Sequence, residues 1–184
     1  MMYPKLSYVF KFTMAGDPAV GKTSLVRRYV TNTFRENYLT TIGVQVSSRE
    51  VTISDINVKL IIWDVAGQSA FSAVKPLYFK GSDAVILVFS VTEKSTFDNI
   101  DNWDMRVREN APKAARILVG NKTDLIEYRE VTPEEGKKKA EALGIPVYLE
   151  SSAKRGSGVS EIFNIAIKLC MQKRLQELKQ TIEG

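Results

Sequence analysis

The segment Gly16-Asp17-Pro18-Ala19-Val20-Gly21-Lys22-Thr23 constrains the fold more than any other part of the chain. Its spacing, Gly, four residues, then Gly-Lys-Thr, is the pattern of a phosphate-binding loop. Residues 8–15 are rich in β-branched and aromatic side chains and predict a strand, whereas residues 22–31 carry apolar side chains at helical spacing. A strand, loop and helix in this order place an anion at a helix N-terminus, where unpaired N–H groups favour it. The segment predicts a nucleoside triphosphate site, with an ordinary glycine-containing turn as the alternative.

The remainder of the chain alternates strand-like and helical segments. We expect strands at 8–15, 44–53, 58–64, 84–91, 116–120 and 146–149, and helices at 22–31, 70–80, 95–109, 133–143 and 158–178. Continuously apolar runs such as 84–89 are typical of strands that helices cover on both faces. A turn-like stretch between 44–53 and 58–64 predicts a hairpin.

These patterns predict an α/β protein with the P-loop NTPase fold. We expect a six-stranded, mostly parallel sheet with one antiparallel edge strand, flanked by about five helices. No linker or repeat divides the chain, so residues 1–184 form one predicted domain. The last helix becomes more polar after Lys173, and we expect its end, 173–184, to project from the body of the fold.

Composition narrows the chemistry that is available. A single cysteine, Cys170, excludes an internal disulfide, and the absence of histidine removes imidazole acid–base chemistry and the commonest transition-metal ligand. The formal net charge of +5 is too dispersed to indicate nucleic-acid binding. We expect a cytoplasmic monomer that uses carboxylates, amides, hydroxyls, lysines or a hard metal ion, with peripheral membrane association left open.

An acidic residue ends the apolar strand expected at 58–64. Asp64 can hold Mg²⁺ opposite the phosphates, because loops at the carboxyl ends of parallel strands converge on the ligand. Gly67 permits close approach of the backbone to a terminal phosphate, and the amide of Gln68 can orient a water. The alternative for Asp64 is a cap on a helix or turn. The segment favours a magnesium-dependent reaction at the terminal phosphate.

Two later segments predict which base is bound. Asn121-Lys122-Thr123-Asp124 follows a strand, and the Asp124 carboxylate can accept two parallel hydrogen bonds from adjacent ring N–H and exocyclic NH₂ groups. Guanine offers that pair and adenine does not, so a buried carboxylate would discriminate between them. Small residues in Glu150-Ser151-Ser152-Ala153-Lys154 let backbone N–H groups approach the base carbonyl. A simple Asn/Asp turn is the alternative.

The polar segment from Phe34 to Gly43 reads as a loop and contains Thr40-Thr41. A hydroxyl there, close to Mg²⁺ and the γ-phosphate, would keep the segment ordered only while that phosphate exists. A threonine that caps the following strand is the alternative. The loop is therefore a candidate nucleotide-dependent switch.

With these motifs in this order, residues 8–172 resemble the Ras superfamily of small GTPases, and the segments 40–44 and 59–64 are most similar to its Rab branch. The resemblance implies a GTP-binding switch with slow, magnesium-dependent hydrolysis to GDP. Effector, exchange-factor and GTPase-activating proteins would read the switch loops 33–43 and 65–80.

The resemblance also implies roles for single residues. Lys22 would contact the β- and γ-phosphates, Thr41 would bind Mg²⁺, and Gln68 would position the attacking water, which makes these three the catalytic candidates. Thr23 would be a further metal ligand, and Asp64 would act on the metal through water. The implied nucleotide site consists of Asp17, Pro18, Ala19, Val20, Gly21, Lys22, Thr23, Ser24, Phe34, Thr41, Gly67, Asn121, Lys122, Asp124, Ser152, Ala153 and Lys154.

Three residues depart from the family pattern: Pro18, Val65 and Ser69. Pro18 fixes φ and removes one N–H from the phosphate loop, and its ring could crowd Gln68 or an arginine supplied by an activating protein. These departures keep open a GTP-binding scaffold that does not cycle. A P-loop metabolic kinase is a further alternative, which Asn121 and Asp124 disfavour.

The last five residues contain no cysteine, so no prenyl anchor is expected within this sequence. Either the tail was cut, or the protein lacks that anchor.

Overall fold

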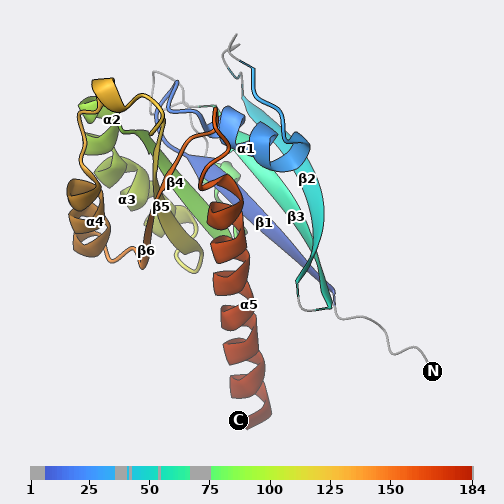
Figure 1. Ribbon diagram of the computed structural model, residues 1–184. Helices are drawn as coiled ribbons and strands as arrows, with labels where there is room; N and C mark the ends of the chain where they lie inside the picture. Colours follow the sequence, from blue (N-terminus) through green and yellow to red (C-terminus); the bar gives the residue numbers. More distant parts are fainter. Residues whose placement is uncertain (1–6, 36–40, 42, 54, 67–75, 184) are drawn as a thin grey trace.

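A six-stranded sheet forms the middle layer of the molecule (Figure 1). The computed structural model describes residues 7–35, 41, 43–53, 55–66 and 76–183. The strand order is β2-β3-β1-β4-β5-β6, in which β2 and β3 are antiparallel and the other neighbours are parallel. The strands are β1 (Ser7–Ala15), β2 (Val44–Ile53), β3 (Ile56–Val65), β4 (Ala84–Ser90), β5 (Ala115–Asn121) and β6 (Val147–Ser151). The predicted sheet and hairpin are confirmed.

Helices cover both faces of this sheet. They are α1 (Lys22–Thr31), α2 (Lys94–Asp98), α3 (Ile100–Asn110), α4 (Pro133–Ala142) and α5 (Val159–Glu183), with short 3₁₀ turns at Pro76–Tyr78 and Ile126–Tyr128. A capping box between Thr132 and Glu135, with Pro133 in the first turn, fixes where α4 begins. No helix in the described part of the chain is long and apolar enough to cross a membrane.

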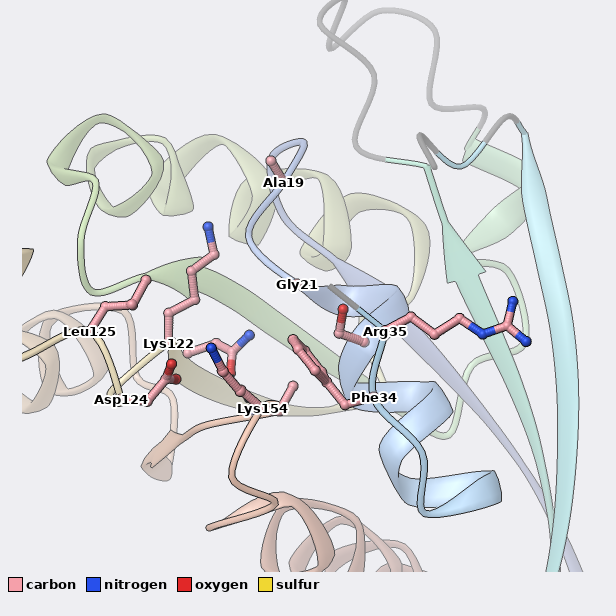
Figure 2. Close-up of a pocket in the computed structure, with 11 residues that line it drawn as sticks. Ala19, Gly21, Phe34, Arg35, Lys122, Asp124, Leu125 and Lys154 are labelled. Carbon is pink, nitrogen blue, oxygen red and sulfur yellow. Dashed lines mark hydrogen bonds between the residues drawn. The ribbon is translucent and has the colours of Figure 1, made fainter. Parts of the chain in front are cut away.

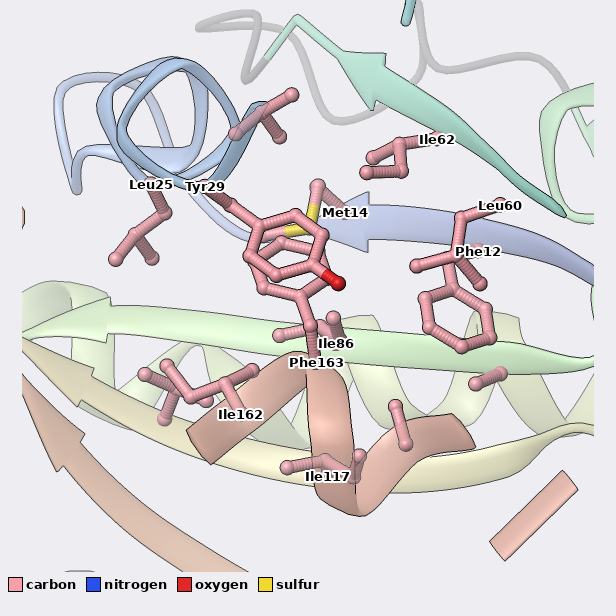
Figure 3. Packing of buried hydrophobic residues seen from close by; sticks show 14 of the residues in the cluster. Phe12, Met14, Leu25, Tyr29, Leu60, Ile62, Ile86, Ile117, Ile162 and Phe163 are labelled. Atoms are coloured by element: carbon pink, nitrogen blue, oxygen red, sulfur yellow. The ribbon is translucent and has the colours of Figure 1, made fainter. Parts of the chain in front are cut away.

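Alternate residues of the central strand β4 divide the core in two. Ala84, Ile86 and Val88 pack against one cluster with side chains of α1 and α5, and Val85, Leu87 and Phe89 join a second cluster with α2, α3 and α4. Figure 3 shows the first cluster, in which Tyr29 of α1 stacks on Phe163 of α5 with ring centroids 3.9 Å apart. This two-sided burial is why β4 is apolar at every position but its last.

Two predicted helices differ in the structure. The predicted helix 95–109 divides at Asn99, where α2 ends and α3 begins. The part of predicted helix 70–80 that is described is a 3₁₀ turn and a turn, and residues 70–75 lie outside the described residues. Pro76 lies inside that prediction, and its missing N–H and its ring disfavour an α-helix through it.

The last helix is longer than predicted and ends at Glu183. Most of its residues from 172 to 182 are exposed, and this end of α5 extends beyond the sheet (Figure 1). The carboxyl ends of the parallel strands β1, β3, β4, β5 and β6 share the opposite edge of the sheet, and the loops of the predicted site follow them there.

Candidate functional site

The phosphate-binding loop connects β1 to α1 and depends on two glycines. Gly16 and Gly21 adopt φ values of +139° and +100°, which side chains rarely permit. A Cβ at Gly16 would lie 2.1 Å from the carbonyl oxygen of Val88, and one at Gly21 would lie 2.3 Å from Nδ2 of Asn121. Gly21 is the N-cap of α1, and no side chain caps the helix there. The first N–H groups of α1 are therefore available to an anion.

Lys22 supplies a buried positive charge within this loop. Its ammonium donates hydrogen bonds to the carbonyl oxygens of Gly16 and Asp17, each at 2.7 Å. Burial lowers the pKa of Lys22 to about 8, while the nearby carboxylates of Asp64 and Asp17 oppose the shift. A polyphosphate in the loop would provide the negative charge that favours the charged ammonium.

Three oxygen-bearing side chains meet beside the loop. The hydroxyl of Thr23 lies 2.8 Å from that of Thr41 and donates to Oδ2 of Asp64 at 2.5 Å. The other oxygen of Asp64, Oδ1, is buried and has no hydrogen-bond partner among the described residues. Burial raises the pKa of Asp64, against the lowering effects of the Thr23 hydrogen bond and of Lys22. This corner is polar, buried and incompletely satisfied.

The corner formed by Thr23, Thr41 and Asp64 fits a hard cation. Mg²⁺ prefers oxygen ligands, uses few protein groups and completes its octahedral shell with waters and substrate phosphates. Within the described residues no three His, Cys, Asp or Glu side chains gather as a metal cluster. The side-chain oxygen ligands that this corner offers to a cation are thus two hydroxyls and one carboxylate.

Asp17 links the phosphate loop to the helices on the other side of the site. Its Oδ1 accepts hydrogen bonds from Nδ2 of Asn99 at 2.6 Å and from Nε1 of Trp103 at 2.7 Å. Trp103 is almost fully buried, so its indole N–H depends on a protein acceptor. The break between α2 and α3 places Asn99 at this contact. The side chain of Asp17 therefore holds the loop in position.

A cavity of about 420 Å³ opens next to the loop (Figure 2). This volume is in the usual range for small-molecule sites. Phe34 lines one wall, and Lys122, Asp124 and Lys154 line the wall across from it. The residues that complete the lining are Ala19, Gly21, Ser24, Arg35, Asn121, Leu125 and Ala153.

Hydrogen bonds between loops fix the polar wall of this cavity. Asn121 donates from Nδ2 to the carbonyl of Val20 at 2.9 Å, and its Oδ1 accepts from the hydroxyl of Ser151 at 3.1 Å. Ser152 donates to Oδ1 of Asp124 at 2.6 Å, which orients that carboxylate. Burial lowers the pKa of Lys122, while Glu93 and Asp124 oppose the shift.

The structure brings most of the predicted site residues together. Those that line the cavity or meet at the phosphate loop and its metal corner are Asp17, Ala19, Val20, Gly21, Lys22, Thr23, Ser24, Phe34, Thr41, Asp64, Asn121, Lys122, Asp124, Ser152, Ala153 and Lys154. Pro18 is exposed on the loop. Gly67, Gln68 and Ser69 lie outside the described residues, so their predicted roles stay predictions.

Two residues that line the cavity, and one that lies behind it, were not among the predicted site residues. Arg35 and Leu125 line it directly, and Arg28 donates hydrogen bonds to the carbonyls of Ala153 and Lys154 behind it. Arg35 and Leu125 each follow a predicted site residue in the sequence, and this adjacency was a usable signal. Arg28 is 125 residues from its partner Ala153, and no local pattern indicates that contact.

Comparisons with known proteins agree with a phosphate-binding loop and an adjacent nucleotide-sized cavity in this chain. The Ras family model matches residues 11–172. Ras-related protein SEC4 of Saccharomyces cerevisiae is 42% identical over 166 residues, which cover 90% of this chain and 76% of that protein. Ras-related protein Rab-4 of Dictyostelium discoideum is 43% identical over 167 residues, 90% of this chain and 81% of that protein. GTP-binding protein ypt1 of Schizosaccharomyces pombe is 36% identical over 177 residues, 96% of this chain and 84% of that protein.

Proposed function

The chain belongs to the Ras family and is a Rab-like GTP-binding switch, and on that premise we propose that it slowly hydrolyses GTP at the site between its phosphate loop and Asp64. The observation that carries the proposal is the buried Oδ1 of Asp64, which has no hydrogen-bond partner among the described residues. The hydroxyls of Thr23 and Thr41 lie next to this carboxylate. A metal held near Thr23, Thr41 and Asp64 would supply positive charge that stabilises the phosphates.

Selection for guanine follows from the polar wall of the cavity. The Asp124 carboxylate is held by Ser152, and Asn121 is held by the carbonyl of Val20. Two adjacent N–H donors on guanine would pair with this carboxylate, whereas adenine would leave it unsatisfied. Phe34, on the opposite wall, would pack against the base.

Positioning and electrostatics would carry out the hydrolysis. Lys22 and the first N–H groups of α1 would stabilise the charge that develops on the phosphates. Thr23, Thr41 and Asp64 would hold Mg²⁺, which would supply positive charge against the charge that develops on the phosphates. Gln68 would orient the attacking water through its amide. Isolated Ras hydrolyses GTP at about 10⁻⁴ s⁻¹, and we expect a similarly slow rate here.

The switch function rests on Thr41. Its contact with the Thr23 hydroxyl connects the loop 33–43 to the phosphate site. Loss of the γ-phosphate would remove the ligand that holds Thr41 near the metal, so this loop and the loop 65–80 would change state after hydrolysis. Effector, exchange-factor and activating proteins would recognise that change. The protein itself would act as a monomer, in the cytoplasm or at a membrane surface.

Single-turnover hydrolysis tests the proposal. The protein would be loaded with GTP in excess Mg²⁺, and GDP formation would be followed for the wild type, for Gln68→Leu and for the control Gln180→Leu on the exposed end of α5. We expect slow conversion by the wild type and the control, with about a tenfold or greater loss in Gln68→Leu. At about 10⁻⁴ s⁻¹ the half-life is about two hours, so GTP that is still unconverted on the wild type after about a day would instead support a non-cycling scaffold. Equal rates in wild type and Gln68→Leu would remove Gln68 from the mechanism.

A further inference from the structure

Arg28, in the second half of α1, connects the end of its own helix to a loop that is distant in sequence. Its Nε donates to the carbonyl of Ala153 at 2.9 Å, and its Nη2 donates to the carbonyl of Lys154 at 2.7 Å. Its Nη1 donates to the carbonyl of Asn32 at 3.0 Å. All three guanidinium nitrogens therefore bind backbone oxygens, a planar arrangement that a lysine cannot reproduce.

These contacts lie behind the two walls of the nucleotide cavity. Ala153 and Lys154 belong to the wall that also contains Asp124, and Phe34 forms the wall across from them (Figure 2). Asn32 caps the end of α1 in a left-handed conformation, with φ of +53°, and Thr33 alone separates it from Phe34. The guanidinium carbon of Arg28 lies 6.0 Å from the ring centroid of Phe34. One side chain thus connects the start of the first switch loop to the base-binding loop.

The base-binding loop carries further contacts that depend on its position. The backbone N–H of Ala153 donates to Oδ1 of Asn121 at 3.3 Å, and Ser152 donates to Asp124. Displacement of Ala153 would therefore disturb the two side chains expected to recognise guanine. Gly156, which adopts φ of +81°, brings this loop close to the stem of Arg28: a Cβ there would lie 3.7 Å from Cδ.

We propose that Arg28 is a positioning residue that sets how long guanine nucleotide stays bound, because it holds the base-binding loop and the start of the first switch loop together. This inference rests on the proposed function. Arg28 lies behind the cavity and does not line it. Release of the nucleotide requires the walls formed by Phe34 and by Ala153–Lys154 to separate, and that separation breaks the hydrogen bonds that converge on one guanidinium.

The test measures dissociation of a fluorescent GDP analogue, chased with excess GDP at saturating Mg²⁺. Arg28→Met keeps the apolar stem and removes every donor, whereas Arg28→Lys keeps the charge and loses the planar fork. We expect dissociation from Arg28→Met to be about tenfold faster than from the wild type, which corresponds to losing one charge-assisted hydrogen bond. Arg28→Lys should fall between the two. Arg155→Met, the same change at an exposed position of the same loop, should stay within about twofold.

A cycle with Phe34→Ala separates this role from a general loss of packing. If Arg28 acts by holding the two walls together, Arg28→Met should accelerate dissociation far less when Phe34 has already been removed. A general structural loss would instead multiply the effects of the two substitutions. Unchanged dissociation from Arg28→Met, an equal increase in Arg155→Met, or independent effects in the cycle would each overturn the inference.

Two further outcomes keep the result interpretable. If Arg28→Met does not fold, the same comparisons with Arg28→Lys decide the question, and wild-type dissociation from Arg28→Lys would refute the role of the fork. If the wild type holds no guanine nucleotide, the proposed function fails at the first measurement. That result is distinct from a wild type that binds GDP with a lifetime insensitive to Arg28.

Discussion

Asp104 of α3 is a fully buried carboxylate whose main partner comes from the sheet. Arg116 of β5 donates from Nη1 to Oδ1 at 2.6 Å, and its guanidinium also donates to the carbonyls of Leu143 at 3.2 Å and Gly144 at 3.0 Å. Nε of Arg108 lies 2.9 Å from the second oxygen, but its side chain is 55% exposed. Removing Arg116 therefore leaves a buried charge with only one solvated partner.

We expect Arg116→Met to destabilise the protein by about 3 kcal/mol. Breaking a buried ion pair from one side costs about 3–5 kcal/mol, and the lower end applies because Arg108 still compensates part of the charge. The carbonyls of Leu143 and Gly144 lie near the surface, where water can replace the lost donors. For a domain of this size, the loss corresponds to a decrease in Tm of roughly 6–12 °C.

Unfolding by heat and by urea at saturating GDP and Mg²⁺ provides the measurement. Arg116 lies near the start of β5, whereas Asn121, at its end, lines the proposed nucleotide cavity, so ligand stabilisation should be equal in both proteins and cancel. Arg108→Met is the matched control, and we expect it to cost about 1 kcal/mol or less because its partner remains paired with Arg116.

The double variant Asp104→Leu/Arg116→Met decides whether the buried charge causes the loss. With the charge removed, stability should return to within about 1 kcal/mol of the wild type, because an apolar pair can replace a buried ion pair. A loss below about 1 kcal/mol in Arg116→Met would refute the reasoning. So would a double variant as unstable as the single one, since the missing packing of Arg116 would then explain the effect.

Two further predictions concern the nucleotide. Asp124→Asn should weaken GDP binding by about a hundredfold and improve binding of xanthosine diphosphate, whose 2-carbonyl can accept from the new amide; competitive displacement would measure both. Burial lowers the pKa of Lys22 to about 8, and bound phosphates would raise it again, so binding takes up a proton above pH 8. GDP affinity should therefore fall as pH rises above 8, by up to about tenfold per unit, and stay flat below pH 7. Calorimetry at pH 8.5 in buffers of different ionisation enthalpy would detect the proton uptake, and a flat profile through pH 10 would contradict it.

The sheet was predictable because its signals are local. The hairpin strand β2 was expected at 44–53 and spans Val44–Ile53, since an alternating pattern between turn residues fixes its ends. The prediction failed where a long-range contact or a breaker intervened. Asn99 interrupts a helical pattern where it donates to Asp17, 82 residues away, and Pro76 begins a 3₁₀ turn, Pro76–Tyr78, where an α-helix was expected.

The candidate site was predictable for a related reason. Lys22, Asp64, Asn121 and Asp124 each follow or end a strand, and parallel strands deliver their carboxyl ends to one edge. Sequence order alone therefore brings these residues near one another. It does not determine that Asn121 binds the carbonyl of Val20, or that Trp103 holds Asp17, because those distances depend on how the helices pack on the sheet.

Arg27 and Arg28 distinguish what the sequence determines from what only the tertiary structure determines. The sequence determines that both lie on α1 just after the phosphate loop, because the helical pattern is local. Consecutive helix residues point about 100° apart, so the two side chains reach different neighbours. Arg27 lines a small cavity of about 120 Å³ with Thr23 and Asp64, whereas Arg28 reaches Ala153 and Lys154. One arginine thus faces the corner that contains Thr23 and Asp64, and the next faces the base-binding loop. The packing of α1 against β2 and α5 determines which arginine faces which site.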